Sequence, residues 1–217
     1  ILVAALAATP VTALAAGSAE YSDGGSGSSY SSGSSRDYAT TVTVSSTGVK
    51  TTGATTSSNG GSSIGVAVDT VTSTGQQVTV NSKGEAVIGD TAIGFAMGVA
   101  ATAGLPNAVV SSIEAINAGQ DLATVTTDVD LTGYSALTGT HAIITKDAST
   151  AAVKTGDVEV SLYVPNLLDS LEGVSVLFYD NATGRWVLLQ PLAVDPVSKT
   201  VTVNVSGSGT LSVVYKR

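Results

Sequence analysis

The chain has 217 residues, of which 12% are charged, and its acidic residues outnumber the basic ones 17 to 9, for a net charge of −8. It contains no Cys, which excludes a disulfide framework, a thiolate metal site and a cysteine nucleophile. A single His excludes a site of several histidines, and so acidic a chain is a poor match for the phosphates of nucleic acids. We therefore expect no metal or other cofactor and no nucleic-acid partner.

Residues 1–16 are predicted to be a secretory signal peptide, truncated at its start. Residues 1–8 are apolar, and small residues follow up to Ala15 and Ala16. This pattern is typical of the second half of a signal peptide, and the apolar run is too short to span a membrane. We therefore expect cleavage after Ala15 or Ala16 and a location outside the cell or on its surface. The lack of Cys also suits a secreted bacterial protein of this kind.

Residues 17–37 are predicted to be a flexible, disordered linker. Ser and Gly dominate this low-complexity segment. Such a composition buries too little apolar surface to offset the entropy that ordering would cost. The segment suits a tether that holds a folded domain away from a surface.

Residues 38–119 are predicted to contain Thr-rich β-hairpins. Residues 42–48 and 78–84 each place an alternating Val/Thr run before a turn that ends in Gly, as hairpins do. The two segments match at several positions with an offset of 36, so they are either a true repeat or two unrelated hairpins. Residues 92–104 are small and apolar, and we expect this stretch to be buried.

One helix is predicted over residues 106–118. Pro106 suits the first turn of a helix, and Gly119 suits its end. Val109, Ile113 and Ile116 recur with helical spacing and form one apolar stripe. We expect this stripe to pack on a sheet.

Residues 120–217 are predicted to form an antiparallel β-sandwich of immunoglobulin-like architecture. Seven segments have the length, alternation and turn spacing of sandwich strands: 124–131, 142–145, 158–164, 174–179, 185–190, 200–205 and 210–215. The fold class is therefore mainly β, with an antiparallel β-sandwich, one short helix and a disordered N-terminal segment.

The best-defined predicted hairpin has a four-residue turn, Asn181 to Gly184, and it aligns Tyr179 with Trp186. Two interpretations of this aromatic pair stay open. The rings form a platform that stacks on sugar rings, or Trp186 fills the core of a small sandwich. Tyr179 and Trp186 are the predicted ligand-binding residues, and we expect no catalytic residues.

Other polar residues have weaker functional interpretations. His141 is interpreted as a residue at a strand edge, since no Gly-x-Ser-x-Gly motif accompanies it. Asp128 and Asp130 lie on one face of the strand predicted at 124–131, and with Asp147 they have the oxygen ligands of a Ca²⁺ site without its loop spacing.

The sequence therefore predicts a secreted or cell-surface protein of structural or adhesion type, without enzymatic activity. The alternative is a carbohydrate-binding module that uses Tyr179 and Trp186. Under either interpretation, the expected partners of the protein are a polysaccharide of the cell wall or of a host, or a protein. Thr-rich strands with few charges also allow a homo-oligomer that pairs through strand edges.

Overall fold

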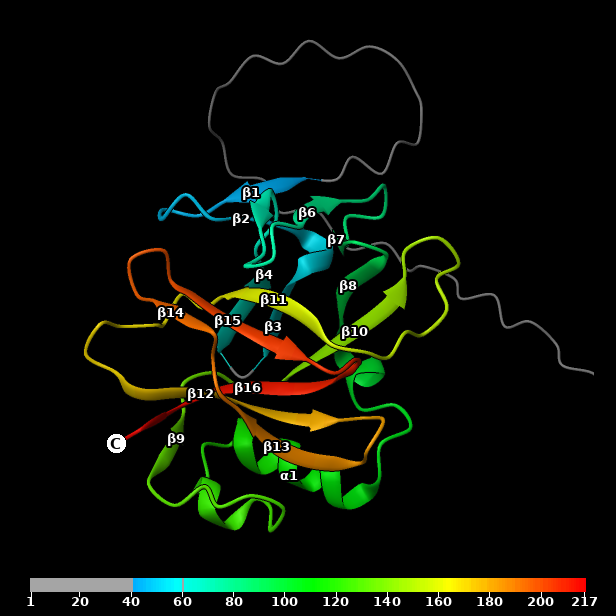
Figure 1. Ribbon diagram of the computed structural model, residues 1–217. Helices are drawn as coiled ribbons and strands as arrows, with labels where there is room; N and C mark the ends of the chain where they lie inside the picture. Colours follow the sequence, from blue (N-terminus) through cyan, green and yellow to red (C-terminus); the bar gives the residue numbers. More distant parts are fainter. Residues whose placement is uncertain (1–40, 60) are drawn as a thin grey trace, which may run out of the picture. The chain divides into compact units, whose positions relative to one another are not determined.

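The computed structural model describes residues 41–59 and 61–217, which lie in one compact unit (Figure 1). The predicted signal peptide, residues 1–16, and linker, residues 17–37, lie outside the described residues. The described chain is mainly β, with antiparallel sheets and one α-helix, which confirms this part of the predicted fold class. No helix in this part of the chain is long and apolar enough to cross a membrane.

The larger sheet has nine strands, and every neighbouring pair in it is antiparallel. Eight strands follow one path across it: β13 (Arg185–Leu189), β12 (Glu172–Asp180), β16 (Gly209–Lys216), β10 (His141–Asp147), β8 (Thr91–Ala96), β7 (Ala86–Ile88), β6 (Gln77–Val80) and β5 (Thr70–Val71). The ninth, β9 (Tyr134–Ala136), pairs with β16.

The smaller sheet has five strands: β14 (Ala193–Asp195), β15 (Thr200–Val205), β11 (Val158–Tyr163), β4 (Ser62–Val66) and β3 (Thr56–Asn59). A separate two-stranded ribbon is formed by β1 (Val42–Val44) and β2 (Lys50–Thr52). The hairpins predicted around residues 42–48 and 78–84 are confirmed as β1–β2 and β6–β7. Gly48 and Gly84 both have a φ of 79°, a left-handed conformation that the turns require.

The two sheets bury one apolar cluster in common. Alternate residues of β11 and β15, such as Val160 and Val203, meet alternate residues of β12 and β16, such as Phe178 and Leu211. Each of these four side chains is 0% exposed. Burial of a Val, Leu or Phe side chain contributes about 1.5–3 kcal/mol, so this cluster is the main source of stability.

The other face of the larger sheet is covered by the helix α1 (Asn107–Asn117), which lies beneath β12 and β13 in Figure 1. Its buried residues are Val109, Ile113 and Ile116, so the predicted helix over residues 106–118 and its apolar stripe are confirmed. They pack with residues of β12 and β16, including Leu177 and Val214. Three short 3-10 helices complete the described chain: η1 (Gly53–Thr55), η2 (Gly98–Ala101) and η3 (Leu122–Thr124).

The strand predicted over residues 124–131 is wrong, because this segment is irregular after η3. Its Asp side chains accept hydrogen bonds from backbone N–H groups. Asp130 binds the N–H of Thr132 at 2.9 Å, and such side-chain bonds compete with strand pairing. The expected burial of residues 92–104 holds only for its first half: β8 is largely buried, but Met97 and Val99 are 61% and 91% exposed.

Strands from both sides of residue 120 lie in the same sheets. β8 pairs with β10, and β4 pairs with β11. Each sheet therefore contains strands from both sides of the domain boundary that the sequence suggests at residue 120.

Replacing Gly209 with Ala is expected to destabilise the protein strongly. A Cβ at this position of β16 would overlap the carbonyl oxygen of Tyr179 and the ring of Phe178, neither of which is the end of a flexible side chain. We expect a loss of about 3 kcal/mol or more in the free energy of unfolding. Urea denaturation measures it. The matched control is Gly53→Ala, where a Cβ meets nothing within 4 Å. Equal midpoints for the two variants would contradict the packing at Gly209.

Candidate functional site

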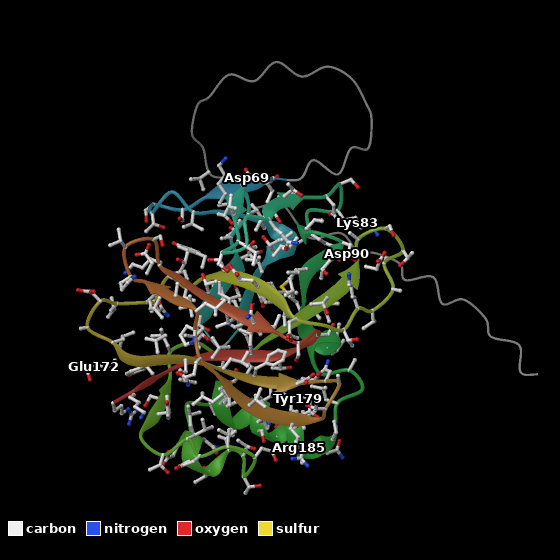
Figure 2. The ribbon with its side chains drawn as sticks, viewed as in Figure 1. Asp69, Lys83, Asp90, Glu172, Tyr179 and Arg185 are labelled. Atoms are coloured by element: carbon white, nitrogen blue, oxygen red, sulfur yellow. The ribbon has the colours of Figure 1, made fainter. Side chains whose placement is uncertain are left out.

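The predicted aromatic pair lies side by side on the β12–β13 hairpin, and Figure 2 labels Tyr179 and Arg185 there. Tyr179 is directly opposite Trp186, as the sequence predicts, with 5.3 Å between the ring centroids and a tilt of 57°. The two residues are only 4% and 3% exposed, because α1 and the segment after it cover them. A stacking platform needs open ring faces, whereas these rings pack within the apolar cluster between α1 and the larger sheet.

A hollow of about 590 Å³ nevertheless lies beside this pair. Its lining combines the two aromatic residues with hydroxyl, amide and carboxylate groups from α1 and the following segment, such as Ser111, Gln120 and Asp128. The Asp128 carboxylate accepts a hydrogen bond from the backbone N–H of Trp186 at 2.9 Å. β13 is the last strand of the sheet, so this N–H points away from the sheet and has no strand partner. Asp128 therefore holds the segment against the hairpin.

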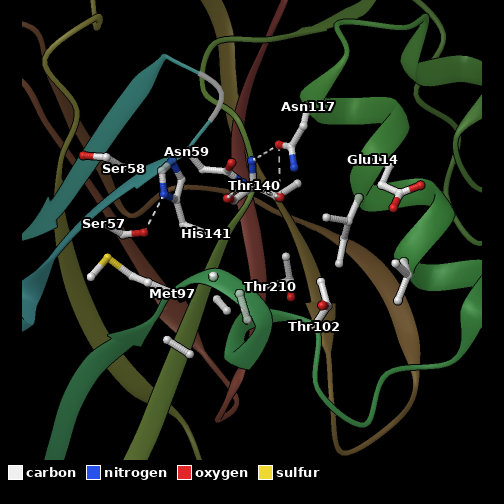
Figure 3. A pocket seen from close by; sticks show the side chains of 16 residues that line it. Ser57, Ser58, Asn59, Met97, Thr102, Glu114, Asn117, Thr140, His141 and Thr210 are labelled. Atoms are coloured by element: carbon white, nitrogen blue, oxygen red, sulfur yellow. Dashed lines mark hydrogen bonds between the residues drawn. The ribbon is translucent and has the colours of Figure 1, made fainter. Parts of the chain in front are cut away.

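A second pocket, of about 240 Å³, lies where β3, η2, α1 and the start of β10 meet (Figure 3). α1 lines it with Val110, Ile113, Glu114 and Asn117, which share one face of the helix. β10 and β16 contribute His141 and Thr210 among others. The pocket thus has an apolar wall on α1 and polar groups around it.

Hydrogen bonds to Thr140 hold the elements at the upper rim of this pocket together. The Asn117 Oδ1 accepts hydrogen bonds from the backbone N–H of Thr140 at 2.8 Å and from its hydroxyl at 3.1 Å. Asn59 Nδ2 donates to the carbonyl oxygen of Thr140 at 2.8 Å. The end of α1, strand β3 and the start of β10 are therefore tied together at one residue.

His141 is a buried, neutral residue of this region. Its ring lies 2.9 Å from the Ser57 hydroxyl through Nδ1, and Nε2 is buried with no hydrogen-bond partner in the described part of the chain. Burial lowers the pKa of His141 to about 4, because the charged imidazolium is poorly solvated there. The imidazole is thus a weak base at neutral pH, and its nearest polar partner is a hydroxyl group.

Two of the carboxylates singled out in the sequence, those of Asp147 and Asp130, are used by their own loops. Asp147 accepts hydrogen bonds from the N–H and hydroxyl groups of Ser149 and Thr150, which lower the pKa of its carboxyl. Thr132 lowers the pKa of Asp130 in the same way. Within residues 41–59 and 61–217, no three His, Asp or Glu side chains are grouped so that they could hold a metal ion.

Ser57, Glu114, Asn117 and Thr210 were not singled out from the sequence. They lie on three separate elements, β3, α1 and β16, and no local motif connects them, so only the fold brings them to one pocket. Comparisons with protein-family models, with curated proteins and with solved structures find no match to this chain.

The fluorescence of Trp186, the one Trp of the chain, is expected to report a buried side chain. We expect a blue-shifted emission maximum and weak quenching by acrylamide, because the residue is 3% exposed. The unfolded chain in guanidinium serves as the exposed reference. Emission that is already red-shifted and readily quenched in the folded chain would instead favour the aromatic platform.

His141 is expected to make stability fall as the pH falls from about 6.5 to 4. Its pKa is about 4 when folded and near 6.5 when unfolded, so between these values the unfolded chain binds a proton that the folded chain does not. The free energy of unfolding should drop by about 2 kcal/mol between pH 7 and pH 5 from this group.

Urea denaturation at both pH values measures the drop, and His141→Gln is the control that should lose it. NMR titration of the only imidazole in the chain checks the pKa directly. A pKa near 6.5 in the folded protein would refute its burial.

Proposed function

We propose that this chain is a non-enzymatic structural or adhesion-type protein that works outside the cell or on its surface. The N-terminal sequence pattern supports the location. The two antiparallel sheets with a core in common support a β-sandwich of immunoglobulin-like type as its architecture. The polar side chains support a structural role, because Asp147, Asp195 and His141 are bound to neighbouring turn or core groups.

The observation that carries this proposal is the apolar free edge of the smaller sheet. β14 is its last strand, and Val194 there is 39% exposed. Leu192 and Val197, on either side of the strand, are 55% and 83% exposed. Strand edges that carry apolar side chains and few charges favour pairing with another chain. We infer that the partner is a second copy of this chain.

Two prolines limit this pairing. Pro191 and Pro196 flank β14, and Pro has no backbone N–H to donate to a strand partner. A partner strand therefore has three residues of β14 to pair with. This favours a small closed assembly, in which the apolar side chains around the edge contact each other, over a long fibre.

Self-association is expected to depend on Val194. Light scattering with size-exclusion chromatography should show an assembly larger than the monomer, and Val194→Lys should return it to the monomer by placing a charge at the edge. The matched control, Thr79→Lys, adds the same charge at an exposed position of β6 in the larger sheet. A monomeric wild-type chain, or an assembly that both variants leave intact, would contradict the proposal.

A carbohydrate-binding module is the second candidate function. It is favoured by the hollow of about 590 Å³ that Tyr179 and Trp186 line together with hydroxyl and amide groups. A polysaccharide in this hollow would touch the ring edges and change the emission of Trp186. A titration with soluble cell-wall polysaccharide tests it, and unchanged emission at saturating concentration would count against it.

A further inference from the structure

The pocket of Figure 3 contains polar groups that the fold does not use. Thr210 is only 3% exposed, but its hydroxyl is open to the pocket and has no hydrogen-bond partner in the described part of the chain. Most buried hydroxyl groups of this protein do have one: Ser212, two residues along β16, donates to the carbonyl oxygen of Thr138 at 2.8 Å. In the described part of the chain, the one buried side-chain polar atom without a partner is Nε2 of His141, which lines the same pocket. A buried polar group without a partner is costly, so one that lines a pocket points to a ligand.

α1 supplies two more free polar groups to the same pocket. The Nδ2 of Asn117 makes no hydrogen bond among the described residues, although the Oδ1 of the same side chain is held by Thr140. The Glu114 carboxylate, one turn away on the helix, has no ion pair or hydrogen bond there either. Thr210, Asn117 and Glu114 therefore offer a hydroxyl, an amide donor and a carboxylate acceptor around one small space.

The pocket also has an apolar part. Val110 and Ile113 form the α1 wall between the polar groups, and Met97 lies at the start of η2 with 61% of its surface exposed. A ligand that suits this pocket must both donate and accept hydrogen bonds, and must also present an apolar face.

We propose that this pocket binds a single saccharide ring without negative charge. Sugar hydroxyls both donate and accept, as Thr210, Asn117 and Glu114 together require, and the C–H groups of a pyranose ring form an apolar face for Val110 and Ile113. The volume of about 240 Å³ lies below that of most drug-sized sites, which limits the ligand to one ring. Glu114 and the net charge of −8 disfavour an anion.

An amine is a poorer match. An ammonium group only donates hydrogen bonds, so it would pair with Glu114 and leave the Asn117 amide without an acceptor. The proposed saccharide site is separate from the hollow beside Trp186 and from the β14 edge. It adds a binding activity to the proposed structural role, and either one can fail without the other.

An NMR titration of the full ¹⁵N-labelled chain tests the proposal. The probes are the methyl glycosides of glucose, galactose and mannose and of N-acetylglucosamine, with glycerol and ethylammonium as comparison compounds. We expect at least one glycoside to give saturable shifts of the amide signals of Glu114, Ala142 and Thr210, with a dissociation constant on the order of 1 mM. Glycerol and ethylammonium should give none.

Two variants decide whether Thr210 and Glu114 hold the ligand. Thr210→Val keeps the side-chain shape and removes a hydroxyl that pairs with nothing in the fold, so it should keep the wild-type stability while binding falls about tenfold. Thr79→Val, at an exposed position of β6, is the matched control and should bind normally. Glu114→Ala, on an exposed helix position, should also weaken binding without unfolding the chain.

Three results would overturn the proposal. The first is that no glycoside gives a saturable shift, or that glycerol gives the same shifts. The second is that the shifts lie outside the pocket, for example on β13 and the segment beside Trp186. The third is that both Thr210→Val and Glu114→Ala bind as the wild type does.

Discussion

Alternate Val, Leu, Ile and Phe side chains of two antiparallel sheets meet in one buried cluster, and the other elements are arranged around it. The contact of Phe178 with Gly209 shows how closely it is packed, because β16 has no room for a Cβ where it passes this ring. The chain itself also joins the two sheets. β13 ends the larger sheet and β14, four residues further on, ends the smaller one. The core can therefore form only when both sheets are in place.

Strand β12 explains why the larger sheet also needs a helix. Its residues are apolar on both faces: Val176 and Phe178 point to the core between the sheets, and Leu177 and Tyr179 point to the other side. Left in water, this second face would expose a large apolar surface. α1 covers it, and the same packing buries Tyr179 and Trp186. The aromatic pair is thus first of all a packing element, whatever the hollow beside it binds.

Local patterns in the sequence predict much of this fold. The alternation in residues 158–163 and 200–205, the turn at Asn181–Gly184 and the helical stripe of α1 all depend on neighbours in sequence, and all appear in the structure. The alternating segment 124–131 is irregular instead, because Asp128 and Asp130 bind backbone N–H groups that strand pairing would use. The pocket cannot be predicted in this way, since Ser57 and Thr210 meet there only through long-range strand pairing.

The many Ser and Thr residues that mark the composition have distinct uses in the structure. Some hydroxyls, such as those of Ser149 and Ser198, fix Asp side chains in exposed turns. Others, such as that of Ser57, satisfy buried polar groups between elements. The second use lowers the free-energy cost of burying polar groups, because each such hydroxyl pairs with a group that would otherwise be buried without a partner. The hydroxyl of Thr210 has neither use, and Thr210 lines the pocket together with His141, whose Nε2 is buried without a partner in the described part of the chain.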